Sequence, residues 1–467
     1  GYKPKVTGLA ETDIEFFQQV PAKLSGSIYI PDYDYALYVN SNTSLQTTTA
    51  NSVTFTLDNP IDFTVSNSLD PTEVSVAQLS GGNPEFFLLK KSRKAFSGEI
   101  VQTTFSVGAP QDFLTLELNA SNIAGIVDII DSDGNKYYEV DYLGQELVFD
   151  GIKNINTNDP NTYLDEDTPY LLQTKSVENR FATRFLSNTI LQIQFGVGNP
   201  NSTTEEIIPN SMNVGLGLPF EQNKLTTAYS PTNFIFTNTY GVAPSNTTLT
   251  VRYYTGGGVQ SNVLSNTITN LNTSNTNFIK GGLDSTLGQY IFNSLASNNP
   301  TAASGGQDGD TIEEIRQNSI SNFSTQLRNV TADDYLVRAL SMPSRYGRIS
   351  KAWTQKPNAD EANTTLDLYI LTQNNQNQLT TASDSLKQNL RTYINEYKMI
   401  GDTISIKDAF VINFGINFEI ITYPNFNSNE VLERCFLALQ SYFITDKWQI
   451  NQPIIIPDLY VMLDALE

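Results

Sequence analysis

The sequence predicts a multidomain α+β protein in which a β-rich N-terminal body is followed by a two-layer α+β C-terminal domain. The chain has 467 residues, well beyond one ordinary core of about 150 residues. Up to about residue 265, short runs that favour strands alternate with Asn, Asp, Pro and Gly. Helical patterns become frequent only after Gly309. These observations indicate several domains, with the helices concentrated toward the C-terminus.

We expect a β-rich N-terminal domain over 1–95 and a β-rich middle domain over 96–265. A stretch rich in Asn, Ser and Thr over 266–310 is typical of a connector. A two-helix junction over 311–353 follows, and the last segment, 354–467, is expected to be an α+β domain that mediates self-association.

The first half of the chain contains several strand signals. The runs 27–30 and 53–57 are typical of a β-meander, and 190–195 and 248–254 alternate with period two. Gly134, in the turn Asp131-Ser132-Asp133-Gly134-Asn135, predicts a hairpin in which this glycine supplies a positive φ. An EF-hand calcium loop is disfavoured, because that loop places its glycine at position six and a glutamate at position twelve.

Two capping boxes predict the helices of the junction. Thr311 and Glu314 have the spacing in which a hydroxyl caps the helix and the carboxylate reaches back to the first residue. Thr331 and Asp334 repeat this arrangement. The second helix should end near Ser341, because Met342-Pro343 follows.

The strongest periodic signal lies in the C-terminal segment. Between 410 and 420 the apolar residues occupy every second position, which predicts a long strand with one apolar face. They are Phe410, Ile412, Phe414, Ile416, Phe418 and Ile420. Helices predicted over 383–398 and 429–443 are expected to cover that face.

Composition excludes several classes of function. The net charge of −21 disfavours nucleic-acid binding, and the basic run 90–94 is short enough to be a solvated loop or strand end. The chain has no His, the commonest general base and metal ligand. Cys435 lies in an apolar helical pattern, so it should be a buried hydrophobe. No apolar run reaches the length of a membrane span, and we expect no cofactor.

The run GGQDGDTIEEIRQNSISNFSTQLRNVTADDY, from Gly305 to Tyr335, resembles the signature of the baseplate J superfamily. It is more closely similar to the baseplate wedge proteins of T-even-like contractile-tailed phages. The resemblance covers most of the chain from about Lys94 onward, and further landmarks occur in the family's order. The first landmarks are 134–135 and 139–143, and then 179–181 and 194–196. The later ones are 251–254, 256–258, 261–262 and 344–347.

The resemblance implies a non-enzymatic virion protein of the tail baseplate, assembled in the cytoplasm of a bacterial host. Such wedge subunits form a ring around the hub and take part in the rearrangement that triggers sheath contraction. The implied partners are a second copy of the chain, other wedge proteins, and hub and sheath-proximal proteins. The family also has an N-terminal helical portion and a last strand that this sequence lacks, so we expect the chain to be part of a longer protein.

The candidate structural or interface residues all lie in or beside the signature run. They are Gly305, Gly306, Thr311, Glu314, Arg316, Arg328, Thr331, Asp334 and Tyr335. We expect Arg316 and Arg328 to be bidentate anchors for carboxylates or carbonyls, within the fold or across a subunit boundary. An equal alternative is that both are solvated helix residues.

Other functions remain open at this point. The β-rich first 260 residues could form a receptor- or glycan-binding domain of a tail protein, or the chain could belong to another contractile injection system. A glycosidase that uses a pair of carboxylates needs no His, and Asp165-Glu166-Asp167 would be candidates. A solvated loop explains that acidic run better.

Overall fold

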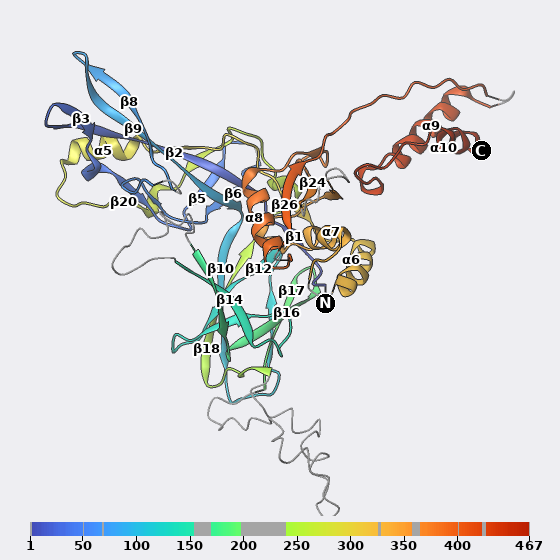
Figure 1. The fold of residues 1–467 in the computed structure, drawn as a ribbon, viewed down its shortest axis with the longest axis horizontal. Helices are drawn as coiled ribbons and strands as arrows, with labels where there is room; N and C mark the ends of the chain where they lie inside the picture. The colour runs from blue at the N-terminus through green and yellow to red at the C-terminus, as the bar shows by residue number, and fades with distance from the viewer. Residues whose placement is uncertain are drawn as a thin grey trace, which may run out of the picture.

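The computed structural model describes residues 2–49, 51–67, 70–153, 170–197, 240–325, 328–356, 365–399, 401–422 and 426–466. These residues form a β-rich N-terminal domain, a second β domain, a mixed domain of helices and strands, and a C-terminal arm that extends away from them (Figure 1). The predicted α+β class, with a β-rich body and helices toward the C-terminus, is confirmed.

The N-terminal domain is built around two long antiparallel strands, β2 (Glu11–Ser25) and β9 (Asn83–Ser97). Their sheet has eight strands in the order β19-β5-β6-β9-β2-β21, with β3 paired to β2 and β8 to β9. The remaining strands are β3 (Ile28–Pro31), β5 (Ser44–Thr47), β6 (Thr54–Leu57), β8 (Glu73–Ser80), β19 (Ile268–Leu271) and β21 (Ala296–Asn298). Buried positions alternate along β2, because successive side chains point to opposite faces, and Phe16, Phe55 and Phe63 lie in the core.

The segment expected to be a connector, 266–310, is instead part of the N-terminal domain. It supplies β19 and β21 to the large sheet, and β20 (Thr276–Phe278) to a small sheet with β4 (Leu37–Val39) and β7 (Ile61–Asp62). It also contains helix α5 (Ser285–Asn293). The prediction from composition was wrong, because Asn, Ser and Thr side chains also form hydrogen bonds with backbone groups at strand ends. Asn299 does so, accepting from the amides of residues 267 and 268.

The basic run 90–94 is not a solvated loop; it lies within β9. The Lys91 ammonium is buried and lies 3.0 Å from a carboxylate oxygen of Asp70. Arg93 donates two hydrogen bonds to the same carboxylate, of 2.6 and 2.8 Å. A long strand can carry such residues because their side chains alternate between faces, and an acid on a neighbouring loop compensates the buried charge.

The second β domain is inserted between β9 and η3 (Val259–Ser261). Its seven-stranded sheet has the order β10-β18-β12-β13-β16-β17-β11, and Ile129, Phe195 and Val251 lie in its core. The strands are β10 (Glu99–Val107), β11 (Thr115–Asn119), β12 (Ile123–Ile130), β13 (Lys136–Glu139), β16 (Arg180–Ser187), β17 (Ile190–Phe195) and β18 (Thr247–Thr255). A separate hairpin joins β14 (Leu147–Lys153) to β15 (Tyr170–Ser176). The predicted turn between β12 and β13 is confirmed, with Gly134 at a φ of 86°.

The third domain combines helices with a four-stranded sheet. Its helices are α6 (Ile312–Thr325), α7 (Ala332–Leu340) and α8 (Asp384–Asn395), and η5 (Ser344–Tyr346) follows α7. Its strands are β23 (Lys351–Gln355), β24 (Thr365–Gln373), β25 (Leu379–Thr380) and β26 (Thr403–Asp408). β24 pairs with the other three strands, and Leu368, Leu386 and Leu390 belong to the core between sheet and helices. The junction and the first part of the predicted C-terminal domain therefore form one unit.

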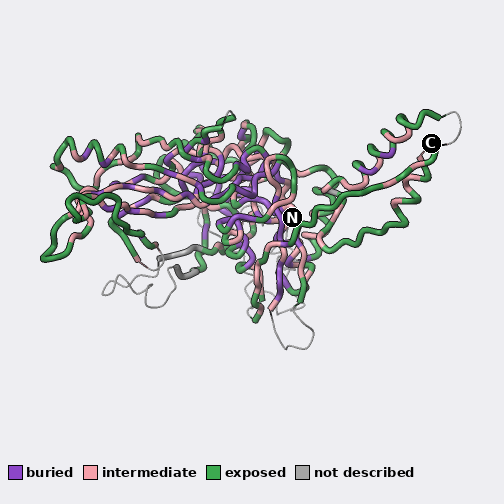
Figure 2. The backbone as a smooth tube through the Cα atoms, turned by 90° about the horizontal axis from the view of Figure 1, so that it is seen from above, coloured by how far each residue is buried: buried purple, intermediate pink, exposed green. Residues whose placement is uncertain are grey.

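The C-terminal arm comprises residues 409–466. It contains helices α9 (Ser428–Tyr442) and α10 (Ile456–Asp464), joined through η6 (Thr445–Lys447). Figures 1 and 2 show the arm extending from the third domain, with most of its backbone coloured as exposed. The predicted helix over 429–443 is confirmed by α9, and Cys435 is buried as expected.

Residues 410–420, predicted to form a long strand, belong to no strand or sheet among the described residues, so that prediction is wrong. Helix α8 does not cover these residues either, because α8 packs in the core of the third domain. The physical reason is connectivity: Ala409 alone separates β26 from this segment, too short a link for a turn back onto β26.

Across the described ranges, no helix is both long and apolar enough to cross a membrane.

We predict that Asp70→Asn destabilises the N-terminal domain by about 2 kcal/mol, because it leaves the Lys91 ammonium buried without its carboxylate. Arg93 would lose its bidentate partner in the same variant. Urea denaturation followed by circular dichroism measures the loss.

Glu73→Gln is the matched control, because Glu73 pairs with Lys90 at 3.4 Å but is 68% exposed. It should change the free energy of unfolding by less than about 0.5 kcal/mol. Equal losses in the two variants would mean that the backbone carbonyls around Lys91 suffice to hold its charge.

Candidate assembly junction

The three domains meet around the N-terminal segment of the chain. β1 (Thr7–Gly8) pairs with β22 (Gln307–Asp308), so the start of the chain is joined to the start of the signature run. The amide of Leu9 donates to the carbonyl of Ser344 at 3.1 Å. Glu11 and Ser304 exchange backbone hydrogen bonds of 2.8 and 3.1 Å. One short segment therefore contacts all parts of the body.

Glycines allow the backbones to approach closely at this junction. A Cβ on Gly306 would lie 2.5 Å from the carbonyl oxygen of Gly258 and 2.9 Å from a side-chain oxygen of Asn262. Gly305 has a φ of 97° and its carbonyl accepts from the amide of Arg348 at 2.9 Å. A side chain at either position would force the segments apart. Gly305 and Gly306, predicted from the sequence, thus lie where three segments cross.

Side chains tie the crossing segments together in a buried network. Asn262 donates to the carbonyl of Gly306 and accepts from its amide, both at 2.8 Å. The hydroxyl of Ser304 donates to that of Ser383 at 2.9 Å, and Ser383 donates to the carbonyl of Glu11 at 3.1 Å. Ser383 is also the N-cap of α8, so the helix begins on the junction itself.

A buried ion pair lies on the other side of the same crossing. Arg348 pairs with Asp310, whose side chain is fully buried, and also donates to the carbonyl of Asp308. The carboxylate of Asp310 further accepts from the hydroxyl of Tyr2 at 2.6 Å and from the amide of Lys5 at 2.8 Å. Three donors on one carboxylate, from Arg348, Tyr2 and Lys5, compensate the cost of burying it.

Two further ionisable groups are buried in the junction. Burial lowers the pKa of Lys5 to about 7, with the nearby Arg348 charge acting in the same direction, and its ammonium donates to the carbonyl of Leu340 at 2.6 Å. Burial raises the pKa of Glu11 to about 8, although Lys94 and a hydrogen bond from Asn389 favour its charged form. Both groups are therefore held in environments that penalise their charge.

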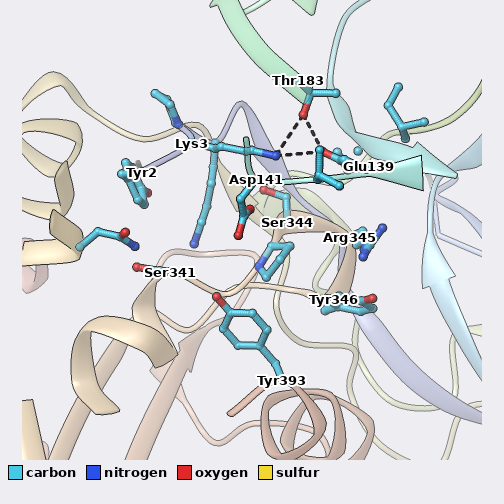
Figure 3. Close-up of a pocket in the computed structure, with 18 of the residues that line it drawn as sticks. Tyr2, Lys3, Glu139, Asp141, Thr183, Ser341, Ser344, Arg345, Tyr346 and Tyr393 are labelled. Atoms are coloured by element: carbon cyan, nitrogen blue, oxygen red, sulfur yellow. Dashed lines mark hydrogen bonds and ion pairs between the residues drawn. The ribbon is translucent and has the colours of Figure 1, made fainter. Parts of the chain in front are cut away.

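A cavity of about 410 Å³ opens beside this network, between the N-terminal segment, the second β domain, α7 and α8. Figure 3 shows Lys3 reaching across it to Glu139 and Thr183. Lys3 lies 3.1 Å from the Glu139 carboxylate, which also accepts from the Thr183 hydroxyl at 2.6 Å. Burial raises the pKa of Glu139, but Lys3, Arg345 and Thr183 outweigh it, and the net shift is downward. The cavity wall is thus closed on one side by an ion pair between domains.

Arg338 lines the other side of the cavity from α7. It is only 2% exposed, and its guanidinium lies 4.1 Å from the ring centre of Tyr397 and 3.4 Å from the hydroxyl of Thr325. Its Nε is buried without a hydrogen-bond partner. The cation–π contact compensates part of the desolvation and fixes α7 against α8.

The structure places the sequence-predicted residues of the two caps as expected. The Thr311 amide donates to the Glu314 carboxylate at 2.7 Å, and the Glu314 amide donates back to the hydroxyl at 3.3 Å. Thr331 and Asp334 form a complete capping box at the start of α7. Burial opposes ionisation of Asp334, but the amides of Thr331 and Val330 outweigh it and lower its pKa. Helix α7 ends at Leu340, with Ser341 as its C-cap.

The remaining candidates lie in different surroundings. Tyr335 is buried and its hydroxyl donates to Asp402 at 2.6 Å; burial first, and this hydrogen bond second, raise its pKa. Arg316 forms an exposed ion pair with Glu313 one turn earlier on α6, and Arg328 is exposed after the end of α6. Neither arginine meets a bidentate acceptor within the described residues, so a role at a subunit boundary stays a prediction. The acidic run 165–167 lies outside the described residues.

The sequence analysis did not single out Arg338 and Arg348, the arginines buried at the junction. Asn262 and Asp310 lie in its landmark runs but were not among its candidate residues. One signal could have indicated Asp310: an acid directly before a capping threonine, in a glycine-rich run. Nothing local distinguishes Arg338 from Arg316, because only the packing of α7 against α8 decides which helix face is buried.

No family model and no curated protein matches this chain. Among solved structures, the chain is similar to a chain of the type VI secretion system TssK-TssF-TssG baseplate subcomplex. That similarity has 8% sequence identity, covers 90% of this chain and 93% of that chain, and has a TM-score of 0.25. A chain of the anti-feeding prophage (AFP) baseplate is similar at 8% identity, over 87% of this chain and 58% of that one, with a TM-score of 0.18. Such low TM-scores carry no argument about fold or function.

The arrangement is suited to holding domains in a fixed relation. Its carboxylates form ion pairs and hydrogen bonds with arginine, lysine and backbone amides of segments that are far apart in the sequence. The described residues contain no group of three or more Asp, Glu, His or Cys side chains placed to bind a metal ion.

We predict that Gly306→Ala lowers the free energy of unfolding by about 1 to 3 kcal/mol, because its Cβ would overlap the Gly258 carbonyl oxygen. The thermal midpoint should fall. Gly281→Ala is the control, since a Cβ there meets nothing within 4 Å. An unchanged midpoint for Gly306→Ala would show that the crossing can widen without loss.

A second prediction concerns pH. Because the pKa of Glu11 is raised from 4.5 to about 8 on folding, the folded state binds the extra proton between these values. The contribution of Glu11 to the free energy of unfolding is therefore full below about pH 4.5 and is lost as the pH rises toward 8. Glu11→Gln should remove this loss. The free energy of unfolding of the variant should therefore rise relative to that of the natural protein by up to about 1.4 kcal/mol per pH unit.

Urea denaturation at pH 5, 5.5 and 6 measures this difference and stays below the folded-state pKa of Lys5, which is about 7. Glu85→Gln, at an exposed position of β9, should show no such trend. A Glu11→Gln variant that loses stability equally at every pH would mean that the charged carboxylate is needed as a partner of Lys94.

Proposed function

We propose that this chain is a structural, non-enzymatic subunit of the baseplate of a contractile tail, in the manner of a wedge protein. It assembles with a second copy of itself and with other baseplate proteins around the tail hub. Its place is the virion, after assembly in the bacterial cytoplasm. The rearrangement of such subunits on host contact releases the sheath for contraction.

The observation that carries the proposal is the convergence of the family landmarks. The runs 256–258, 261–262, 305–308 and 344–347 are up to 91 positions apart in the sequence, yet they contact one another at the junction. Their shared property is close backbone approach, not reactive chemistry. A resemblance that rests on these residues is therefore a resemblance in how the domains are joined.

The physics of the junction fits a part that transmits force. Hydrogen bonds between backbones and a buried ion pair lose much of their energy over displacements below an ångström, so the domains should move as one body. Glycine crossings add stiffness because no flexible side chain separates the segments. A baseplate subunit needs this property, since a compliant joint would absorb the movement it has to pass on.

A labelling experiment tests the proposal. A peptide tag on this chain, produced during tail assembly in the source cell and decorated with gold, should mark the baseplate at the distal end of the sheath in electron micrographs. Gold at the tips of tail fibres would instead support the receptor-binding alternative. Particles that assemble without any label would contradict a structural role in the tail.

Untagged particles and particles carrying the same tag on a sheath protein serve as the negative and positional controls.

A further inference from the structure

The cavity at the junction is bordered by two arginines that form no ion pair among the described residues. Arg338 of α7 and Arg345 of η5 both line this cavity, whose volume is about 410 Å³. Neither guanidinium lies within 4 Å of a carboxylate in the described part of the chain. The Nε atom of each is buried and has no hydrogen-bond partner there. The cavity is therefore a place where a molecule from outside the chain can supply the missing negative charge.

Arg338 has the more deeply buried of the two charges. The residue is only 2% exposed, its guanidinium lies 4.1 Å from the ring centre of Tyr397, and it donates to the hydroxyl of Thr325 at 3.4 Å. An aromatic face and one neutral hydroxyl compensate only part of the cost of removing a guanidinium from water. A negative charge in the cavity would compensate more of it.

Arg345 borders the cavity where η5 packs against the second β domain. Its guanidinium lies 4.6 Å from the ring centre of Tyr346, and a Cβ on Gly125 of β12 would lie 3.9 Å from its side chain. Figure 3 shows Arg345 and Tyr346 on one wall of the cavity, with Tyr393 of α8 below them. Packing against neighbouring groups therefore holds this guanidinium at the cavity.

The acidic residues of the lining do not neutralise these arginines. Glu139 is paired with Lys3 at 3.1 Å. Asp141 and Glu396 are exposed, so that water and salt screen their charges. Lys5, which is 7% exposed, adds a further buried amino group to the lining. The buried part of the cavity lining is therefore positive, whereas its acids face solvent or are already paired.

We propose that this cavity binds a small organic anion whose carboxylate or phosphate group pairs with Arg338 and Arg345. Guanidinium groups form strong, charge-assisted hydrogen bonds with both kinds of oxyanion. The cavity is within the range of about 300 to 1,000 Å³ that is usual for small-molecule sites, and a single inorganic ion would not fill it. The rings of Tyr346, Tyr393 and Tyr397 line the same cavity and offer apolar surface to the rest of such a molecule.

A ligand at this place would strengthen the junction. The cavity lining comes from the N-terminal segment, the second β domain, α7, η5 and α8. Because the unfolded chain does not form this site, ligand binding should raise the thermal midpoint as the ligand concentration increases. The inference goes beyond the proposed function, since it uses only the geometry of the junction.

Isothermal titration calorimetry of the full chain tests the site with two probes at constant ionic strength. Citrate represents a carboxylate ligand and glycerol 3-phosphate a phosphate ligand. At least one of them should bind saturably, one molecule per chain, with a dissociation constant below about 1 mM. The probe that binds more tightly identifies which of the two oxyanions the site prefers.

The Arg345→Gln variant tests whether binding occurs in this cavity. It should weaken binding at least about tenfold, because it removes one of the two guanidinium groups. Arg391→Gln is the matched control, since Arg391 is exposed on α8 and does not line the cavity. The control removes the same charge from the chain and should change the affinity by less than about twofold. Circular dichroism confirms that each variant is folded.

Arginine labelling of the natural chain locates the bound probe without any substitution. Phenylglyoxal modifies accessible guanidinium groups, and mass spectrometry of the peptides measures the rate at each arginine. The bound probe should slow the modification of Arg345 and leave that of Arg391 unchanged.

An absence of saturable binding by both probes would overturn the proposal. Binding that Arg345→Gln leaves unchanged would also overturn it, as would equal protection of Arg345 and Arg391, because the anion would then be held adventitiously elsewhere on the surface. The gold label is a separate measurement: a chain that binds neither probe but still marks the baseplate would refute this site and leave the proposed function standing.

Discussion

Close contacts between glycine backbones at the centre of the molecule constrain the positions of the surrounding domains. Gly306 packs on Gly258, and a side chain on Gly257 would meet the carbonyl of Gly8 at 2.3 Å. The same device marks the root of the inserted β domain, where a Cβ on Gly98 would lie 2.1 Å from the carbonyl of Thr255. The strands that enter and leave that domain are thereby clamped together, and its position relative to the rest follows from their contact.

Buried charged groups fix the relative orientation of the segments that cross at the junction. A hydrophobic contact tolerates sliding, whereas the Asp310 carboxylate is held by donors from Tyr2 and Lys5 of the N-terminal segment and from Arg348, far along the chain. Displacing any one of them would leave a charge buried without its full set of partners, which costs several kcal/mol. Such groups add little net stability, but they select one geometry among many similar packings. The role proposed for this chain, in which the domains keep a fixed angle, would benefit from that selection.

The molecule thus contains two kinds of surface. At the junction, most buried carboxylates, amides and hydroxyls have partners within the chain, although the Nε atoms of Arg338 and Arg348 have none. The C-terminal arm differs, with apolar side chains such as Phe410, Ile421 and Tyr460 largely exposed. An internally packed junction beside an arm with exposed apolar side chains is compatible with the proposed role in an assembly, because exposed apolar patches often mark contacts with other molecules.

Local chemistry was enough to predict the capped helices, the Gly134 turn, the strands around Ile193 and Val251, and the burial of Cys435. Each of these depends on interactions within a few residues, so a short window of sequence contains the information. The alternation over 410–420 predicted a strand that the structure does not contain, because a strand also needs a partner that a short window of sequence cannot show.

Tertiary structure alone decided where the charges lie and which segments meet. The sequence offered Arg316 and Arg328 as anchors, and the fold buried Arg338 and Arg348 instead, because helix packing and chain crossing select the buried face. The polar stretch 266–310 became part of a sheet for the same reason: its partners, β5 and β2, lie more than 200 residues earlier. Local pattern determines what a segment can form, whereas contacts between distant residues determine what it pairs with, and those contacts exist only once the whole chain has folded.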